Sequence, residues 1–164
     1  MAPVLHFCQW LYGSTLGTSI RESTYLFPII ETVHVLGLTL VVGTIAIVDL
    51  RLLGIVFRRE KFSEIVGQVL PLTWSGFAIM FASGFLIFTS EAVDAYRNPA
   101  FRIKLVLLLF AGLNPLIFHS TIYRSVATWD DARVAPRQVR ATAILSLTLW
   151  SAIIIAGRAI AYFH

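Results

Sequence analysis

Glu31 and His34 are two ionisable residues inside a long apolar stretch of the sequence. They are three residues apart and therefore share one face of a helix, and Gly37 follows on that face after another three residues. An ionisable side chain at the centre of a bilayer costs about 2.5 kcal/mol or more, so such residues are candidates for function. A second histidine, His119, lies in a later apolar stretch, with Gly112 two turns earlier on the same face.

This combination of histidines and glycines predicts a haem site. Neutral imidazole is a common ligand of haem iron, helical bundles commonly hold cofactors between facing helices, and a glycine beside each histidine leaves room for a flat porphyrin. Ligation by two histidines favours electron transfer over oxygen chemistry. We therefore expect haem b, in one or two copies, with His34 and His119 as iron ligands. Three alternatives stay open: histidines that form only structural hydrogen bonds, a site for another metal, and a proton path.

The depth of the two histidines in the membrane decides whether they could share one haem. With span midpoints near Leu40 and Gly112, His34 lies toward the outer side and His119 toward the inner side, and straight helices would separate them by about 20 Å. A shared haem then requires helix tilt or a kink at Pro115. Otherwise there are two sites, each completed by a second ligand such as the same residue of a neighbouring subunit. The two-site arrangement is slightly favoured.

Two basic residues, Lys104 and Arg158, lie in apolar stretches at about the depth of the first histidine. Either could bind a haem propionate, because a cation favours a bound carboxylate. Arg158 could instead form a buried ion pair with Glu31, since a lone charge at that depth is costly. His6 and His164, near the two ends of the chain, are weaker candidates as ligands.

Two further polar pairs have simpler interpretations. Asp49 and Arg51 mark the inner end of the first span, where we expect a solvated helix end with local pairing. Asn114 directly precedes Pro115, and we expect its side chain to restore hydrogen bonds that the proline removes from its own helix.

The composition of the chain places these residues in a membrane. Hydrophobic residues make up 57% of the 164 residues and charged residues 13%, whereas soluble domains carry about 25% charged residues. We therefore expect an integral membrane protein and not a soluble enzyme; whether it catalyses a reaction stays open. The net charge of +4 comes from basic residues in short segments between apolar runs, which is typical of membrane topology and not of nucleic-acid binding. The single cysteine, Cys8, excludes an internal disulfide framework.

Four apolar stretches are long enough to cross about 30 Å of hydrocarbon. They cover residues 25–48, 69–88, 103–123 and 141–162. We expect an all-α bundle of four transmembrane helices that forms one domain over residues 1–164. Residues 1–24 are expected to form an interfacial segment with one short helix at residues 4–12. Asn98 and Pro99 are a typical N-cap and first helical residue for the third span.

The Lys and Arg residues predict the orientation of the bundle. Of the 13 basic residues, eight belong to the side of the first and third connections and five to the other side. The positive-inside rule places the larger group in the cytoplasm and both termini in the periplasm. The larger group consists of Arg51, Arg58, Arg59, Lys61, Arg124, Arg133, Arg137 and Arg140. The smaller group consists of Arg21, Arg97, Arg102, Lys104 and Arg158.

Two segments, FPIIETVHVLGLTLVVGTIAIVDLRLLG and FRIKLVLLLFAGLNPLIFH, carry a resemblance to a known family. Together with the segment GTSIRES before the first span and the segment SAIIIAGRAIAY in the fourth span, they resemble bacterial four-helix membrane proteins of unassigned function. That family is distantly similar to the membrane domain of copper-resistance-D-like proteins and to small cytochrome b proteins. The resemblance covers nearly the whole chain and implies a bacterial inner membrane. The matching positions are Glu31, His34, Gly37, Asp49, Arg51, Lys104, Asn114, His119 and Arg158.

Together these patterns predict a haem-b-binding membrane protein that transfers electrons. We expect it to be surrounded by lipid, to act as a homo-oligomer or as a subunit of a larger complex, and to exchange electrons with a redox partner protein or a quinone. The alternatives are a metal- or proton-handling transporter and a structural membrane subunit without a cofactor. The scarcity of cysteine and methionine departs from the soft ligands that copper prefers.

Overall fold

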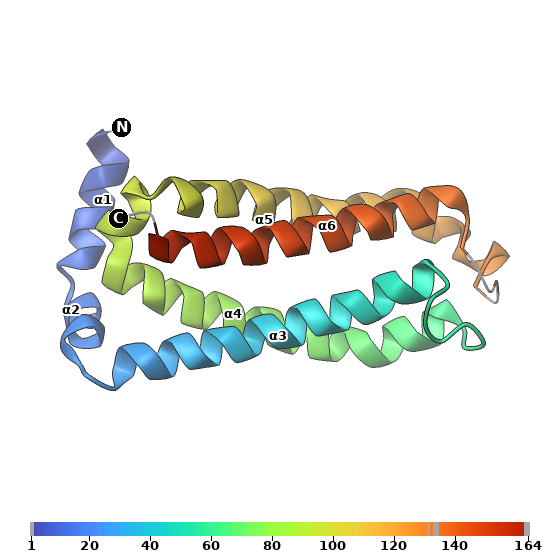
Figure 1. Ribbon diagram of the computed structural model, residues 1–164, viewed down its shortest axis with the longest axis horizontal. Coiled ribbons are helices and arrows are strands. Elements are labelled where there is room, and N and C mark those ends of the chain that lie inside the picture. Colours follow the sequence, from blue (N-terminus) through green and yellow to red (C-terminus); the bar gives the residue numbers. More distant parts are fainter. Residues whose placement is uncertain (1, 131, 133–134, 163–164) are drawn as a thin grey trace.

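The computed structural model describes residues 2–130, 132 and 135–162, with the backbone alone for residues 2 and 121–125. Every regular element in this part of the chain is a helix (Figure 1). The helices are α1 (Ala2–Tyr12), α2 (Thr15–Glu22), α3 (Leu26–Leu52), α4 (Phe62–Arg97), α5 (Pro99–Ile117) and α6 (Arg137–Ala159). Short turns follow α5 (Phe118–Ile122 and Tyr123–Thr128) and α6 (Ile160–Tyr162).

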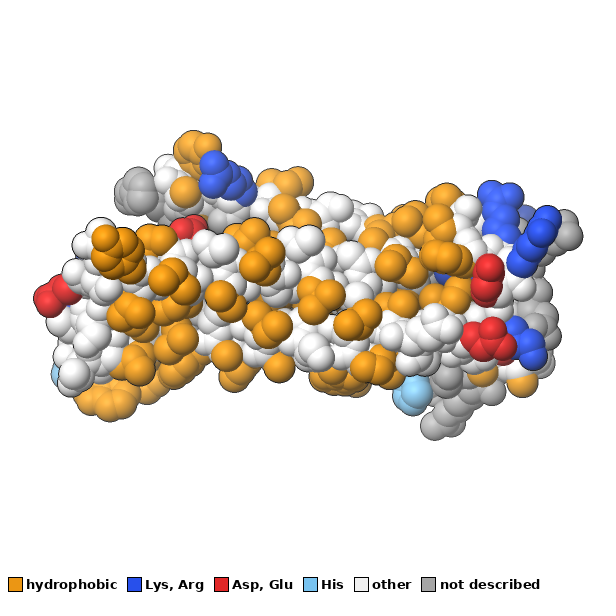
Figure 2. All heavy atoms as spheres, turned by 90° about the horizontal axis from the view of Figure 1, so that it is seen from below, with side chains coloured by type: hydrophobic (Ala, Val, Ile, Leu, Met, Phe, Trp, Pro, Cys, Tyr) orange, Lys and Arg blue, Asp and Glu red, His pale blue; other side chains and the backbone are white. Residues whose placement is uncertain are grey.

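Four helices, α3 to α6, are long and apolar enough to cross a membrane. This confirms the predicted all-α fold and shows a multi-pass membrane protein. Large hydrophobic side chains remain exposed along these helices, as lipid contact requires; Trp74 and Phe81 of α4, for example, are 66% and 81% exposed. Figure 2 shows such side chains distributed along the length of the bundle, whereas charged side chains gather at its ends.

The helices form two antiparallel pairs. α3 packs along α4, α5 packs along α6, and the two pairs meet mainly through α3 and α6 (Figure 1). One end of the bundle carries α1, α2 and the end of α6, and we call it the terminal end. The other end carries the α3–α4 and α5–α6 connections, and we call it the loop end. The position of a functional residue can therefore be described by the helix pair to which it belongs and by the end of the bundle at which it lies.

Two buried apolar clusters hold the pairs together. The middle cluster consists of Val41, Ala111, Trp150 and Ile153. The loop-end cluster consists of Leu52, Phe62, Trp129, Ala135, Val139 and Ala143. Both clusters draw residues from α3 and α6, which are the helices that join the two pairs.

The segment before the first span contains two helices, not the single one expected at residues 4–12. The second, α2, is capped by Ser14, whose Oγ accepts a hydrogen bond from Gly17 N at 3.1 Å. Arg21 at the end of α2 donates from Nη1 to Ser90 O of α4 at 3.1 Å. Cys8 of α1 is buried against α4. Both short helices are thereby fastened to the terminal end of the bundle.

Asn98 sets the turn between α4 and α5. Its Oδ1 accepts hydrogen bonds from Ala100 N at 2.9 Å and Phe101 N at 3.3 Å, which confirms the predicted N-cap. Its Nδ2 donates to Ile160 O at 3.0 Å and so ties the start of α5 to the end of α6. Shortly before this turn, α4 bends at Glu91, where the backbone leaves the helical region (φ −125°, ψ 23°).

Candidate functional site

His34 lies in the seam between α3 and α4, where Ser83 determines the state of its ring. His34 Nδ1 is 3.0 Å from Ser83 Oγ. The hydroxyl of Ser83 has one hydrogen, and it donates this hydrogen to Ile79 O at 2.6 Å. Toward His34 the hydroxyl oxygen therefore acts as the acceptor, so we assign the ring hydrogen to Nδ1. The lone pair of a neutral imidazole is then on Nε2, the nitrogen that remains for a ligand.

Glycines let α3 and α4 approach closely around this ring. A Cβ atom on Gly84 would lie 3.0 Å from Cε1 of His34, so the ring packs directly against the α4 backbone. A Cβ on Gly37 would lie 2.9 Å from Cγ2 of Ile79, and one on Gly76 would lie 2.8 Å from Cγ2 of Val41. The space beside Gly37, which we expected to admit a porphyrin, is thus filled by α4.

Lys104 brings a cation to the same site from the other helix pair. Its side chain is half-buried and runs past Gly157 of α6, where a Cβ would lie 3.6 Å from Nζ. Lys104 and Glu31 are charged residues close enough to His34 for an electrostatic interaction with its ring. We call His34, Ser83, Gly84 and Lys104 the histidine–lysine site. It lies at the junction of the two helix pairs, in the terminal half of the bundle.

The buried ion pair expected between Glu31 and Arg158 is not present. Both side chains are exposed, and no ion pair connects them. Glu31 lies in the second turn of α3 and Arg158 in the last turn of α6, both at the terminal end. Long side chains this close to a helix end can extend to the membrane surface, so neither charge needs a buried partner.

His119 lies at the opposite end of the bundle from His34. It is exposed in the turn Phe118–Ile122, and the ring of its neighbour Phe118 packs edge-on against Phe62, with 6.2 Å between centroids. Phe62 is the first residue of α4, whereas Ser83, the partner of His34, is 21 residues later, about 30 Å along the helix. The two histidines of one chain are therefore too far apart to bind the same haem.

The other predicted site residues do not join the histidine–lysine site. Gly112 is exposed on α5, with no atom within 4 Å of the position of a Cβ. His6 is exposed on α1, and Arg133 and His164 lie outside the described residues. Within the described part of the chain, no three His, Cys, Asp or Glu side chains gather as metal ligands. The site thus offers a metal a single imidazole.

Sequence reasoning missed Ser83 and Gly84. A signal for Ser83 was present, because Gly76 and Ser83 are seven residues apart and lie on one face of α4. Small residues at such spacing are typical of close helix packing in membranes. That face is the one that meets α3, and Gly76 and Ser83 are both buried there.

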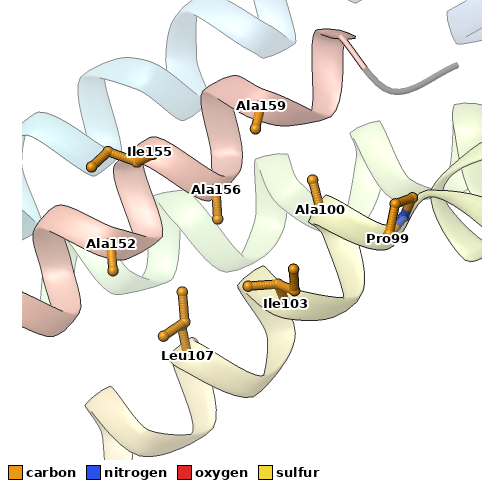
Figure 3. Close-up of a pocket in the computed structure, with 8 residues that line it drawn as sticks. All are labelled: Pro99, Ala100, Ile103, Leu107, Ala152, Ile155, Ala156 and Ala159. Atoms are coloured by element: carbon orange, nitrogen blue, oxygen red, sulfur yellow. The ribbon is translucent and has the colours of Figure 1, made fainter.

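A separate apolar groove of about 450 Å³ runs between α5 and α6 on the outside of the bundle. Figure 3 shows its lining residues, with Ala152 and Ala156 of α6 pointing toward Leu107 and Ile103 of α5. The lining consists of Pro99, Ala100, Ile103, Leu107, Ala152, Ile155, Ala156 and Ala159. Neither His34 nor Lys104 borders this groove, so it is distinct from the histidine–lysine site.

The chain belongs to DUF6644, a family of unknown function, whose model matches residues 7–163. The match spans all four membrane helices together with most of α1 and all of α2. Among curated proteins and solved structures, none matches the chain.

Proposed function

We propose that this protein binds haem b in the bacterial inner membrane and transfers electrons, with His34 as an axial ligand of the iron. The observation that supports this proposal is the 3.0 Å contact between His34 Nδ1 and Ser83 Oγ. It holds the ring by one nitrogen and leaves the lone pair of Nε2 for a metal. Histidines that bind metals generally donate their other ring N–H to a protein acceptor in this way, which fixes the tautomer and the direction of the ring.

The residues of the histidine–lysine site fit a haem in chemistry and in charge. Haem iron binds imidazole, and Lys104 offers an ammonium group for a propionate at the edge of the macrocycle. His34 and Lys104 come from different helix pairs, so a cofactor bound to both would join the pairs at the terminal end. When bound, haem supplies reversible one-electron chemistry. Ser83 and Gly84 would keep the imidazole in a fixed direction during that chemistry.

The place of this site along the bundle indicates where electrons would enter and leave. Lys and Arg side chains gather at the loop end (Figure 2), so the positive-inside rule favours a cytoplasmic loop end and periplasmic termini. A haem at His34 would then lie near the periplasmic face, within reach of a redox partner protein or a membrane quinone.

A single chain supplies one histidine to this site, because His119 lies at the loop end. A second ligand of the iron would come from a neighbouring copy of the chain, or the iron would remain accessible to small ligands. The spectrum of the reduced protein distinguishes these arrangements. A Soret band that shifts with carbon monoxide indicates an open position, and one that does not shift indicates two protein ligands.

The test is the haem content of protein purified from cells supplied with haem, measured as the pyridine haemochrome. We expect about one haem per chain in the wild type, loss of nearly all haem in His34→Ala, and full content in His119→Ala. The His119→Ala variant is the control, since it also removes an imidazole, but from an exposed turn at the loop end. A colourless wild type, or a His34→Ala variant with unchanged haem, would refute the proposal.

A further inference from the structure

Asp49 is a buried carboxyl group in the loop half of the bundle, far from the histidine–lysine site. Its side chain is only 6% exposed. On α3 it lies between Val41 of the middle cluster and Leu52 of the loop-end cluster, and apolar side chains therefore surround it along the helix in both directions. His34 is 15 residues earlier on α3, about 22 Å along the axis. Asp49 is therefore separate from the histidine–lysine site.

Within the described part of the chain, one hydroxyl group lies within hydrogen-bonding reach of the carboxyl group. It belongs to Ser146 of α6, across the contact between α3 and α6. Oδ2 of Asp49 is buried and has no hydrogen-bond partner among the described residues. One turn before Ser146 on α6, Thr142 O accepts a hydrogen bond of 3.3 Å from Asn114 Nδ2. Polar groups of three helices therefore lie close together between the two apolar clusters.

No charged side chain in the described part of the chain compensates an ionised Asp49. Arg51, two residues later on α3, directs its guanidinium away and binds backbone carbonyls of both loop-end connections. Glu64 at the start of α4 and Arg140 at the start of α6 are exposed. Asp49 also lies in the last turn of α3, where the helix dipole disfavours a negative charge. A buried carboxylate without a partner would be strongly destabilising here.

We propose that Asp49 is a proton-binding site of the bundle, with the proton on Oδ2 and exchange toward the loop end. The reaction is the reversible loss of H⁺ from the carboxylic acid to water, which leaves a carboxylate between α3 and α6. The neutral acid keeps the α3–α6 contact closed through Ser146. Loss of the proton creates a buried charge that only water can solvate, so it opens this contact on the loop side. The inference goes beyond haem binding and does not depend on it.

The test is the infrared spectrum of the purified protein in lipid, which separates the carbonyl stretch of a protonated carboxyl group from the bands of carboxylates. We expect a protonated-carboxyl band at neutral pH in the wild type that is absent in Asp49→Asn and decreases as the pH is raised. Glu64→Gln, which changes an exposed acid near the same end, should keep the band. Ser146→Ala should keep it at a shifted frequency, because the bridging hydrogen bond is lost.

Three outcomes would overturn the proposal. The first is a wild type without a protonated-carboxyl band at neutral pH. The second is the same band in Asp49→Asn. The third is a band that disappears when sodium or potassium is added at constant pH, which would make Asp49 a cation site. Should Asp49→Asn fail to fold, the frequency shift in Ser146→Ala still decides the question. Because the band can be recorded without haem, its absence and a failure to bind haem are distinguishable.

Discussion

The guanidinium group of Arg51 donates two hydrogen bonds to the carbonyl oxygen of Glu60, from Nε at 3.1 Å and from Nη2 at 2.7 Å. Its remaining N–H groups reach Ala132 O at 3.3 Å and Asp130 O at 3.4 Å, which belong to the other connection at the loop end. Arg51 is only 2% exposed. One buried side chain therefore joins the α3–α4 connection to the α5–α6 connection.

Replacement of Arg51 should destabilise the bundle. In Arg51→Leu, carbonyl groups of both connections lose a donor, and a buried carbonyl left without any partner costs about 1–3 kcal/mol. Arg51→Lys should be nearly as unstable, because an ammonium cannot serve several carbonyls in the geometry of a planar guanidinium. The measurement is the thermal unfolding midpoint in detergent, with Arg58→Leu, an exposed arginine of the same connection, as the control. Equal midpoints for Arg51→Leu and Arg58→Leu would contradict this role.

Ser83→Ala should weaken haem binding without unfolding the protein. The substitution removes the acceptor that holds Nδ1 of His34, and loss of such a partner typically costs 10- to 100-fold in metal affinity. Ser75→Ala is a matched control, since Ser75 is an exposed serine of α4 whose hydroxyl also bonds to a carbonyl four residues earlier. Haem titration of the two apo-variants provides the comparison. Identical affinities would show that Ser83 does not position the ligand.

Gly84→Ala tests the packing of the same ring. The added Cβ would lie 3.0 Å from Cε1 of His34, closer than most side chains approach, so the ring must shift and its contact with Ser83 is strained. We expect the haem content to fall at least as far as in Ser83→Ala. The circular dichroism spectrum should remain that of a helical protein. Gly43→Ala, on α3, adds the same atom where nothing lies within 4 Å, and it should leave haem content unchanged.

The sequence predicted the parts of the fold that depend on local patterns. Hydropathy identified the four membrane helices, because each crosses the bilayer with an apolar surface of its own. The Asn98 cap followed from residue type and position alone. The second short helix, α2, was missed because its sequence, TLGTSIRE, is polar and it is held by contacts with α4.

The site could be predicted only in part because its geometry depends on which faces of different helices meet. His34 was found as an ionisable residue in an apolar run, but its partner Ser83 is 49 residues away and is selected by the α3–α4 register. Asn114 was expected to repair its own helix at Pro115, yet its amide binds Thr142 O on α6. Arg51 was expected to be solvated, and it is buried because the two connections fold over it.

Asp130 makes the stability of the loop end dependent on pH. Its Oδ1 accepts a hydrogen bond from Ser63 N at 2.8 Å and its Oδ2 one from Ser63 Oγ at 2.7 Å, which caps the start of α4. Partial burial alone would raise the pKa of Asp130, but these hydrogen bonds, with the nearby charges of Lys61 and Arg51, lower the pKa below its ordinary value of 3.8. A carboxyl group whose pKa is lowered by folding stabilises the folded state above its unfolded pKa.

This stabilisation should be complete at neutral pH and should disappear as the pH falls from about 4 through the lower pKa of the folded protein. Asp130→Asn keeps an acceptor for Ser63 N but carries no charge, so its unfolding midpoint should lie below that of the wild type at pH 7 and approach it in acid. Unfolding midpoints of both proteins, measured between pH 3 and pH 8 (a range set by the carboxyl pKa values), give the comparison. Glu64→Gln removes a neighbouring acid that is exposed. The difference between its unfolding midpoint and that of the wild type should not follow this pH profile. A constant difference between Asp130→Asn and the wild type over the whole range would mean that the carboxylate charge does not contribute to the cap.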